Sequence, residues 1–291
     1  MQIFRKKNDG YVLALGGGGA RGLAHVGVLK ILQNEGIGIK GIAGTSMGAV
    51  VGAMFSYYGD AIEVEEVFRK FMSTKLNKEF GRLFLLLSGN LGAYQEPSRL
   101  VKLLERGYVY LKAARSRAIF SRNIVSDTLR ELLPDIEFDE LKVPFVSVAT
   151  DLITGREVIF NSGSLLRAVE ASSLIPGIVE PVKIGKSIYV DGSTTSTVPV
   201  AAARKIFGGQ VVAVDVSMEL KRGGQPNTAF EVALRAGEIT SYYLTRVWLS
   251  QADVVIHPNV GQTYWANFEK LDEMIRAGES AARKSISLLK N

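Results

Sequence analysis

Two short segments of this sequence place glycine and serine at spacings that suit acyl-transfer chemistry. The second of them, Gly44-Thr45-Ser46-Met47-Gly48, fits the G-x-S-x-G pattern of a nucleophile elbow. An elbow lifts its serine hydroxyl above the end of a sheet on a strained turn, so the positions two before and two after it must be small. Ser46 is therefore the candidate nucleophile, and Gly44 and Gly48 are the small residues that the turn requires. The alternative is a serine that only caps the helix after it.

The first segment, Gly16-Gly17-Gly18-Gly19-Ala20-Arg21-Gly22, offers consecutive backbone amides. It also fits G-x-G-x-x-G, but a dinucleotide-binding fold needs an acidic residue about 20 positions later, and none stands there. Amides aimed at a carbonyl oxygen form an oxyanion hole, in which losing one donor typically costs about 2.7–4 kcal/mol of barrier. We therefore favour an oxyanion loop, in which Arg21 either anchors the turn or meets a phosphate.

A serine nucleophile needs a base, and the sequence offers two candidates. His257 follows the apolar run DVVI and lies after Ser46 in the chain, as an α/β-hydrolase triad requires. Asp191 ends another apolar run and precedes Gly192, which presents a carboxylate on a tight turn, although an aspartate there most often only forms the turn. His25 lies within a predicted helix, at a spacing that favours a structural role. The residues alone leave both bases open.

Apolar periodicity predicts the elements that must position these residues. The chain begins with the order strand, helix, strand, helix, which is typical of a parallel sheet covered on both faces. The sequence therefore predicts an α/β fold. The predicted strands are 11–15, 37–43, 144–150, 188–190, 211–216 and 254–256, with a hairpin over 151–160, and the predicted helices are 23–34, 47–58, 124–133, 163–172, 200–207, 229–249 and 266–289.

The composition bounds the kind of protein. Hydrophobic residues make up 47% and charged residues 22%, the balance of a packed globular chain. Because there is no cysteine and only two histidines, we expect no disulfide, metal centre or cofactor. Residues 1–10 lack a signal-peptide core, and no apolar stretch approaches the roughly 20 residues of a membrane span. We therefore expect a soluble, cytoplasmic protein.

One stretch departs from the alternation of strands and helices. Residues 70–122 hold the apolar run Leu83 to Leu87 and most of the basic charge, and we interpret them as an insertion or lid. Between Arg69 and Arg130, Lys and Arg outnumber Asp and Glu by nine, against +6 for the whole chain. Such a segment attracts anionic lipid head groups or nucleic acid, or is only a solvated face. The predicted organisation is one domain over 1–291, with a core at 11–259, an insertion at 70–122 and a C-terminal helix at 266–289.

Three separated motifs coincide with one family. The order G-G-G-x-R-G, G-x-S-x-G and a distant D-G-[GA] resembles the patatin-like phospholipases, and the segments GLAHVGVL, VSVATDLITGREVIF, AVEASSLIPGIVEPV and VPVAAARKIFGG are similar to the small bacterial members. The resemblance covers about residues 11–259 and implies a three-layer α/β/α fold with a mainly parallel central sheet. It also implies a dyad without histidine, with Ser46 as nucleophile and Asp191 as its base. The sequence departs from the family at Ser193, where Gly or Ala is usual; serine is small, so we expect the turn to survive.

The resemblance implies the remaining site residues and the substrate class. Gly17, Gly18 and Gly19 would supply the oxyanion amides, and residues 171–176 would shape a loop near the site. The substrate would be a lipid or lysophospholipid ester, hydrolysed without metal or cofactor. The supporting positions are Arg21, Gly22, Gly44, Gly48, Gly192 and Pro176.

Other hypotheses stay open. One is an esterase with a Ser46–Asp–His257 triad, and another is a catalytically silent protein that binds a lipid or an anion. We also expect a transient contact with an anionic membrane surface at the inner membrane face, and no nucleic-acid partner. Phospholipase, lysophospholipase and acyl-thioesterase activities all stay open, as do the acyl chain length, the head group, the position of cleavage and the oligomeric state.

Overall fold

The described part of the chain is built on one eight-stranded sheet. The computed structural model describes residues 10–74, 116–220, 225–226, 228–261, 263 and 267–290. The strands are β1 (Tyr11–Leu15), β2 (Ile39–Thr45), β3 (Phe145–Asp151), β4 (Arg156–Phe160), β5 (Val182–Ile184), β6 (Ser187–Asp191), β7 (Val211–Val214) and β8 (Val254–Ile256). Five of them run parallel in the order β3-β2-β1-β7-β8, whereas β4 and β6 pair antiparallel with β3, and β5 pairs antiparallel with β6.

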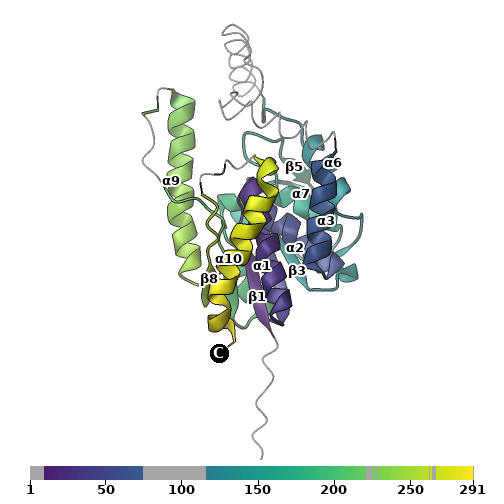
Figure 1. Ribbon diagram of the computed structural model, residues 1–291. Coiled ribbons are helices and arrows are strands. Elements are labelled where there is room, and N and C mark those ends of the chain that lie inside the picture. Colours follow the sequence, from purple (N-terminus) through teal and green to yellow (C-terminus); the bar gives the residue numbers. More distant parts are fainter. Residues whose placement is uncertain are drawn as a thin grey trace, which may run out of the picture.

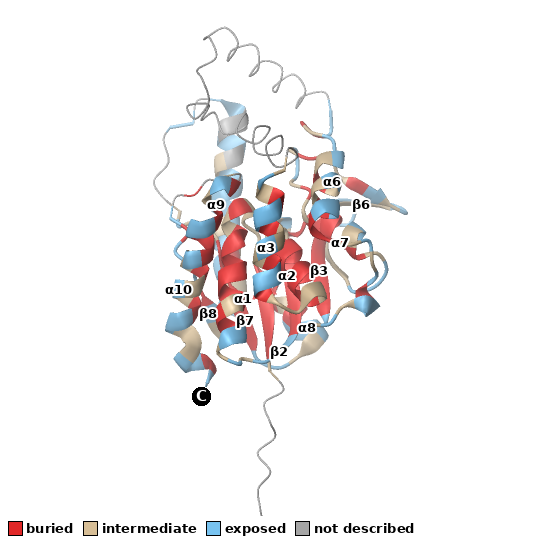
Figure 2. Ribbon diagram, turned by 45° about the vertical axis from the view of Figure 1, so that its right-hand side comes forward, coloured by how far each residue is buried: buried red, intermediate tan, exposed pale blue. Residues whose placement is uncertain are grey.

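The central strands are short apolar runs because both of their faces are covered. Every residue of β1 is buried, with Leu13 and Leu15 in one core cluster and Val12 and Ala14 in another. A strand that alternates apolar and polar residues could not occupy this place. Figure 2 shows the strands as a buried layer behind helices whose outer faces are exposed.

Helices cover the two faces of the sheet unequally. They are α1 (Ala24–Asn34), α2 (Met47–Tyr58), α3 (Ala61–Met72), α6 (Asn123–Leu132), α7 (Leu165–Ser172), α8 (Val200–Phe207), α9 (Ala229–Leu249) and α10 (Leu271–Leu289). The larger core cluster draws on α1, α2, α3, α6, α7 and α10, and the smaller one on α8 and the end of α9. The predicted three-layer α/β/α fold is therefore confirmed (Figure 1).

Most predicted elements are present, with ends that differ by a few residues, but two were missed. No helix was predicted at α3 and no strand at β5. The start of α3 carried a signal, because Asp60 is an N-cap whose side chain accepts the Ile62 N–H at 2.8 Å. The strand β5 has only three residues and pairs solely with β6 in the described sheet, so its sequence alone gives little sign of it.

The predicted insertion falls only partly within the described residues. Its first residues, Lys70 to Met72, belong to α3, whereas 75–115, including Leu83 to Leu87, lie outside the described residues. The insertion and the one-domain organisation therefore stay predictions. Within the described ranges, no helix is both long enough and apolar enough to cross a membrane.

Candidate active site

Ser46 lies at the sharp turn between β2 and α2. Its backbone has φ 54° and ψ −126°, and it is the one non-glycine residue with positive φ among the described residues. Such strain concentrates at functional sites. A Cβ at Gly44 would approach the Cα of Ala49 to 2.5 Å, and one at Gly48 would overlap the Leu15 carbonyl. Glycine at both positions therefore lets α2 start directly after the turn that carries Ser46.

A buried serine fixes the backbone of this turn. The Ser46 N–H donates to Ser172 Oγ at 2.9 Å, and that hydroxyl donates to the Val148 carbonyl at 2.6 Å. Ser172 is fully buried at the end of α7, so α7 and β3 together hold the turn that carries Ser46. The sequence placed residues 171–176 near the site but gave Ser172 no individual role.

Asp191 lies near Ser46 because β2 and β6 pair with successive stretches of β3. β2 ends beside Val148, and β6 pairs with β3 from Ala149 onward. On its other side, β3 pairs with β4 from Ser147 to Asp151. β2 and β6 therefore share one side of β3 and meet end to end, and the antiparallel β6 stops at Asp191. A Cβ at Gly192 would meet the Val148 carbonyl and the Thr45 side chain, so glycine allows this close approach.

The carboxyl group of Asp191 is buried beside the candidate nucleophile. Its residue is 4% exposed, and its Oδ1 accepts the Ser193 N–H at 2.8 Å. Burial raises the pKa of Asp191 above the usual aspartate value, and hydrogen bonds from the Ser46 hydroxyl and from Ser193 oppose that rise. A carboxylate in this environment is a stronger base than one in water.

The glycine loop lies beside Ser46, but the first of its three predicted oxyanion donors, the Gly17 amide, already makes a hydrogen bond within the protein. The Gly17 N–H donates to the Thr197 carbonyl at 2.9 Å, so the prediction that Gly17 supplies an oxyanion amide is wrong. Glycine is needed there for close packing, because a Cβ would lie 3.2 Å from the Cβ of Ser46. In the described part of the chain, the amides of Gly18 and Gly19 donate to no backbone acceptor, and Gly19 lines the pocket beside Ser46. These two amides remain the candidate donors.

Arg21 holds the glycine loop from within. Its Nε donates to the Gly18 carbonyl at 3.0 Å, which is the anchoring role of the two that the sequence suggested. Burial lowers the pKa of its guanidinium, and the charges of Asp215 and Glu238 oppose that change. Gly22 lets the loop lie against α2, because a Cβ at this position would lie only 2.6 Å from the Cβ of Met47.

His257 is engaged with another carboxylate. Its Nδ1 lies 3.0 Å from Asp215 Oδ2, and this hydrogen bond raises the pKa of the imidazole. For Asp215, burial favours a higher pKa, but the hydrogen bonds from His257 and Ser217 outweigh burial and lower the pKa. His257 follows β8, which is three strand spacings from β2, or about 14 Å. This arrangement does not place His257 beside Ser46.

His25 has the structural role that its helical spacing predicted. It is fully buried, its Nε2 donates to the Gly16 carbonyl at 2.8 Å, and burial lowers its pKa to about 4. The neutral ring therefore supports the start of the glycine loop. Among the described residues, no group of three or more His, Asp and Glu side chains could hold a metal ion.

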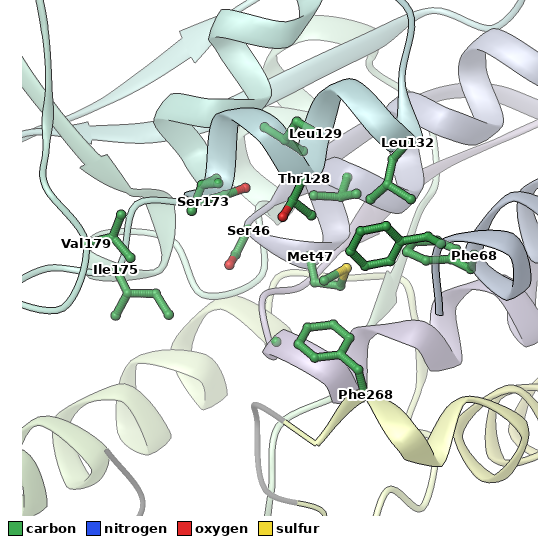
Figure 3. Close-up of a pocket in the computed structure, with 14 residues that line it drawn as sticks. Ser46, Met47, Phe68, Thr128, Leu129, Leu132, Ser173, Ile175, Val179 and Phe268 are labelled. Atoms are coloured by element: carbon green, nitrogen blue, oxygen red, sulfur yellow. The ribbon is translucent and has the colours of Figure 1, made fainter. Parts of the chain in front are cut away.

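An apolar pocket of about 70 Å³ opens beside Ser46. In Figure 3, Ser46 stands near Ser173, with Phe68 and Leu132 on one side and Ile175 on the other. Pro176, which was predicted to shape this region, is itself exposed, and its neighbour Ile175 lines the pocket. The pocket-lining residues are Gly19, Ser46, Met47, Val50, Phe68, Phe71, Val125, Thr128, Leu129, Leu132, Ser173, Ile175, Val179 and Phe268.

The elbow, the glycine loop and the Asp-Gly turn all fall in the part of the chain that matches a known family. A family model described as patatin-like phospholipase matches residues 13–204, more than half of the chain. The chain belongs to the patatin-like phospholipase family. The match includes Ser46 and Asp191, so the resemblance noted from the sequence is confirmed.

Relatives of this patatin-like chain are larger proteins. An uncharacterised NTE family protein of Mycobacterium tuberculosis is 29% identical over 302 residues, which cover 94% of this chain and 46% of the relative. The neuropathy target esterase sws of Drosophila melanogaster is 27% identical over 209 residues, which cover 71% of this chain and 13% of that protein. The chain thus spans half or less of the length of these relatives.

A solved structure shows the same fold. VipD from Legionella pneumophila superposes with a TM-score of 0.52 at 13% sequence identity, covering 97% of this patatin-like chain and 67% of VipD. At that identity the similarity concerns the arrangement of the sheet and helices alone.

Proposed function

We propose that this patatin-like protein is a serine acyl hydrolase that cleaves fatty-acyl esters of lipids, with Ser46 as nucleophile and Asp191 as its base. The observation that carries the proposal is a strained serine, hydrogen-bonded to a buried carboxylate with a raised pKa, at the wall of an apolar pocket. Family membership supports the reaction class, and the geometry supports the roles of the two residues.

The first half of the reaction acylates the enzyme. Asp191 takes the hydroxyl proton as Ser46 Oγ bonds to the ester carbonyl carbon, and the carbonyl oxygen becomes an oxyanion. The amides of Gly18 and Gly19 stabilise that charge. The bond from the carbonyl carbon to the alcohol oxygen then breaks, and the alcohol leaves with the proton that Asp191 held.

The second half releases the fatty acid. A water molecule gives a proton to Asp191 and attacks the acyl carbon, and the bond to Ser46 Oγ breaks as that oxygen regains a proton. The base is the same in both halves, so the scheme needs no histidine. It depends on the burial of Asp191, because a carboxylate with an unperturbed pKa near 4 is a poor base for a serine hydroxyl.

The character of the pocket supports a proposal for where the acyl chain and the alcohol part of the ester bind. Its side chains are apolar except for Ser46, Thr128 and Ser173, so it suits the acyl chain, and the polar alcohol would leave toward solvent. We therefore propose a glycerophospholipid or lysophospholipid as the substrate, rather than a polar ester.

A covalent probe tests the nucleophile. A fluorophosphonate should label the wild-type protein, and Ser46→Ala should abolish labelling and reduce hydrolysis of a chromogenic short-chain ester by at least about a thousandfold. Ser173→Ala is the matched control, since Ser173 also lines the pocket, and it should keep its labelling. A folded wild-type protein that does not label would favour the silent lipid- or anion-binding alternative.

A second experiment tests the acyl pocket. Thr128→Trp places a large ring where Thr128 lines the cavity, so it should reduce hydrolysis of long-chain lysophospholipids more than tenfold while short-chain esters change less. Thr128→Val, which keeps the side-chain volume, is the control. Equal losses on both chain lengths would mean that the acyl chain binds elsewhere.

A further inference from the structure

Two large apolar side chains stand exposed together at the turn between β3 and β4. Leu152 is 50% exposed and Ile153 is 63% exposed, which makes Ile153 the most exposed large hydrophobic residue among those described. Adjacent exposed aliphatic residues favour burial against a partner, whereas single ones are common on protein surfaces.

The turn that carries them is rigid. Asp151 accepts the Ile153 N–H at 2.9 Å, the Thr154 hydroxyl at 3.0 Å and the Ser187 hydroxyl at 3.0 Å. The Leu152 N–H donates to the Ile188 carbonyl at 2.8 Å. The exposed side chains are therefore held outward by a fixed backbone and do not belong to a frayed loop.

The hydrogen bond from Ser187 joins this turn to the turn between β5 and β6. We call the two turns, residues 151–155 and 185–186, the paired turns. Exposed basic residues flank them, and within the described residues none of these makes an ion pair. The nearby carboxylates are Glu157, which is half-buried beside the turn, and Glu180, which lies before β5. The basic residues are Arg156, Lys183 and Lys186.

The paired turns project beyond the edge of the sheet that carries Ser46. Val148 of β3 is in register with Thr45 of β2, and β3 continues to Asp151, which is about 10 Å farther along the strand. Leu152 and Ile153 lie farther still. In Figure 2 the strand labelled β6 lies at the outer edge of the molecule, on the side away from the C-terminus.

We propose that the paired turns dock this protein on a lipid surface with anionic head groups, by inserting Leu152 and Ile153 among the lipids. The proposal rests on the proposed function, because the surface supplies the lipid ester. Apolar side chains with a basic surround fit the boundary between head groups and acyl chains, where they bury apolar area and pair with negative charge. Because the paired turns project beyond the end of the sheet that carries Ser46, docking would bring that end of the molecule to the same surface.

A tryptophan scan tests the insertion directly. Ile153→Trp should show a blue-shifted emission when vesicles of phosphatidylcholine and phosphatidylglycerol are added, and a weaker shift with phosphatidylcholine alone. The matched control is Leu288→Trp, because Leu288 is 61% exposed near the opposite end of the sheet, where Tyr11 Oη donates to the Leu289 carbonyl at 3.0 Å. No shift for Ile153→Trp, or the same shift in both variants, would overturn the proposal.

Binding and activity measurements separate this proposal from the proposed function. Ile153→Ser should weaken cosedimentation with the mixed vesicles about tenfold, and Lys183→Gln with Lys186→Gln should weaken it about fivefold for each lysine. Each variant should keep wild-type rates on a soluble short-chain ester and should lose rate on vesicle-borne lysophospholipid. Leu288→Ser should change neither.

The outcomes discriminate further. Unchanged vesicle binding in the Ile153 and lysine variants would overturn the docking proposal, while soluble-ester hydrolysis by the wild type would keep the catalytic one. Absence of soluble-ester hydrolysis in the wild type would overturn the catalytic one alone. A wild-type dimer that Ile153→Ser dissociates, without vesicle binding, would assign the paired turns to a second copy of the chain.

Discussion

Two aspartates at the same edge of the sheet have the same local structure and opposite acid–base character. Asp191 ends β6 and accepts the Ser193 N–H at 2.8 Å, and Asp215 follows β7 and accepts the Ser217 N–H at 2.9 Å. Yet the pKa of Asp191 is raised, whereas that of Asp215 is lowered. Both are buried, so burial does not distinguish them.

The difference lies in the other hydrogen-bond partner of each carboxyl group. Asp215 receives a hydrogen bond from a histidine that carries positive charge when protonated, and this offsets the cost of a buried anion. Asp191 receives one from the neutral hydroxyl of Ser46, which offsets much less. The comparison teaches that the D-x-S turn alone does not raise the pKa of its aspartate. The pKa rises where no positively charged partner offsets the burial of the carboxylate.

The largest expected effect comes from removing each carboxylate in turn. Asp191→Asn should reduce ester hydrolysis about a thousandfold or more, because the amide cannot accept the Ser46 proton. Asp215→Asn should reduce it less than tenfold, since that carboxylate serves His257 and the glycine loop. Equal losses in initial-rate measurements would show that the two sites act together, and activity in Asp191→Asn with none in His257→Ala would restore the triad.

The same two variants should change the melting temperature in opposite directions. The folded pKa of Asp191 is raised, so this carboxyl group costs folding free energy as the pH rises above the unfolded pKa, and the cost is complete above the folded pKa. Asp191→Asn should therefore raise the melting temperature at neutral pH, with the gain vanishing at pH values below the unfolded aspartate pKa. For Asp215 the folded pKa is lowered, so the wild type gains stability above the unfolded pKa, and Asp215→Asn should lower the melting temperature at neutral pH.

A smaller effect separates the two serines that follow. The Ser193 hydroxyl hydrogen-bonds to Asp191 in addition to the backbone N–H and lowers its pKa, so Ser193→Gly, which keeps the N–H, should raise the pKa and move the acid limb of kcat/KM to higher pH. Ser217→Gly is the matched control, because Ser217 makes the corresponding hydrogen bonds to Asp215. We expect severalfold changes for Ser193→Gly below neutral pH and none for Ser217→Gly. If the two variants had identical pH profiles of kcat/KM, the acid limb would not report the ionisation of Asp191.

The smallest effect is expected from the histidine. His257→Ala should leave ester hydrolysis within about threefold of the wild type. The folded pKa of His257 is raised, so its pair with Asp215 stabilises the protein below the unfolded pKa near 6.5 and loses that contribution as the pH rises through the folded pKa. The imidazole is half-exposed, so solvent screening keeps the loss small, and urea titrations at pH 5.5 and pH 9 should differ only slightly.

The sequence was sufficient for what local chemistry determines. The strand, turn and helix around Ser46 follow from the small residues at Gly44 and Gly48 and from the apolar runs beside them. The parallel core followed from the same periodicity, because strands buried on both faces are uniformly apolar.

What the sequence could not give depends on pairing between distant segments. The Gly17 amide is lost to Thr197, which comes 180 positions later, and no property of a glycine run announces that acceptor. The role of Ser172 depends likewise on where α7 ends against β3. The meeting of Asp191 with Ser46 required β6 to occupy the side of β3 beyond β2, a register that neither strand encodes by itself.

The end-to-end meeting of β2 and β6 has a consequence for the order in which the molecule acquires its chemistry. The turn that carries Ser46 is synthesised well before β6, and Asp191 comes beside it only when β6 pairs with β3. A chain synthesised no farther than β3 would carry the Ser46 hydroxyl without its proposed base, Asp191. In the proposed mechanism, hydrolysis of lipid esters therefore requires that β6 has paired with β3.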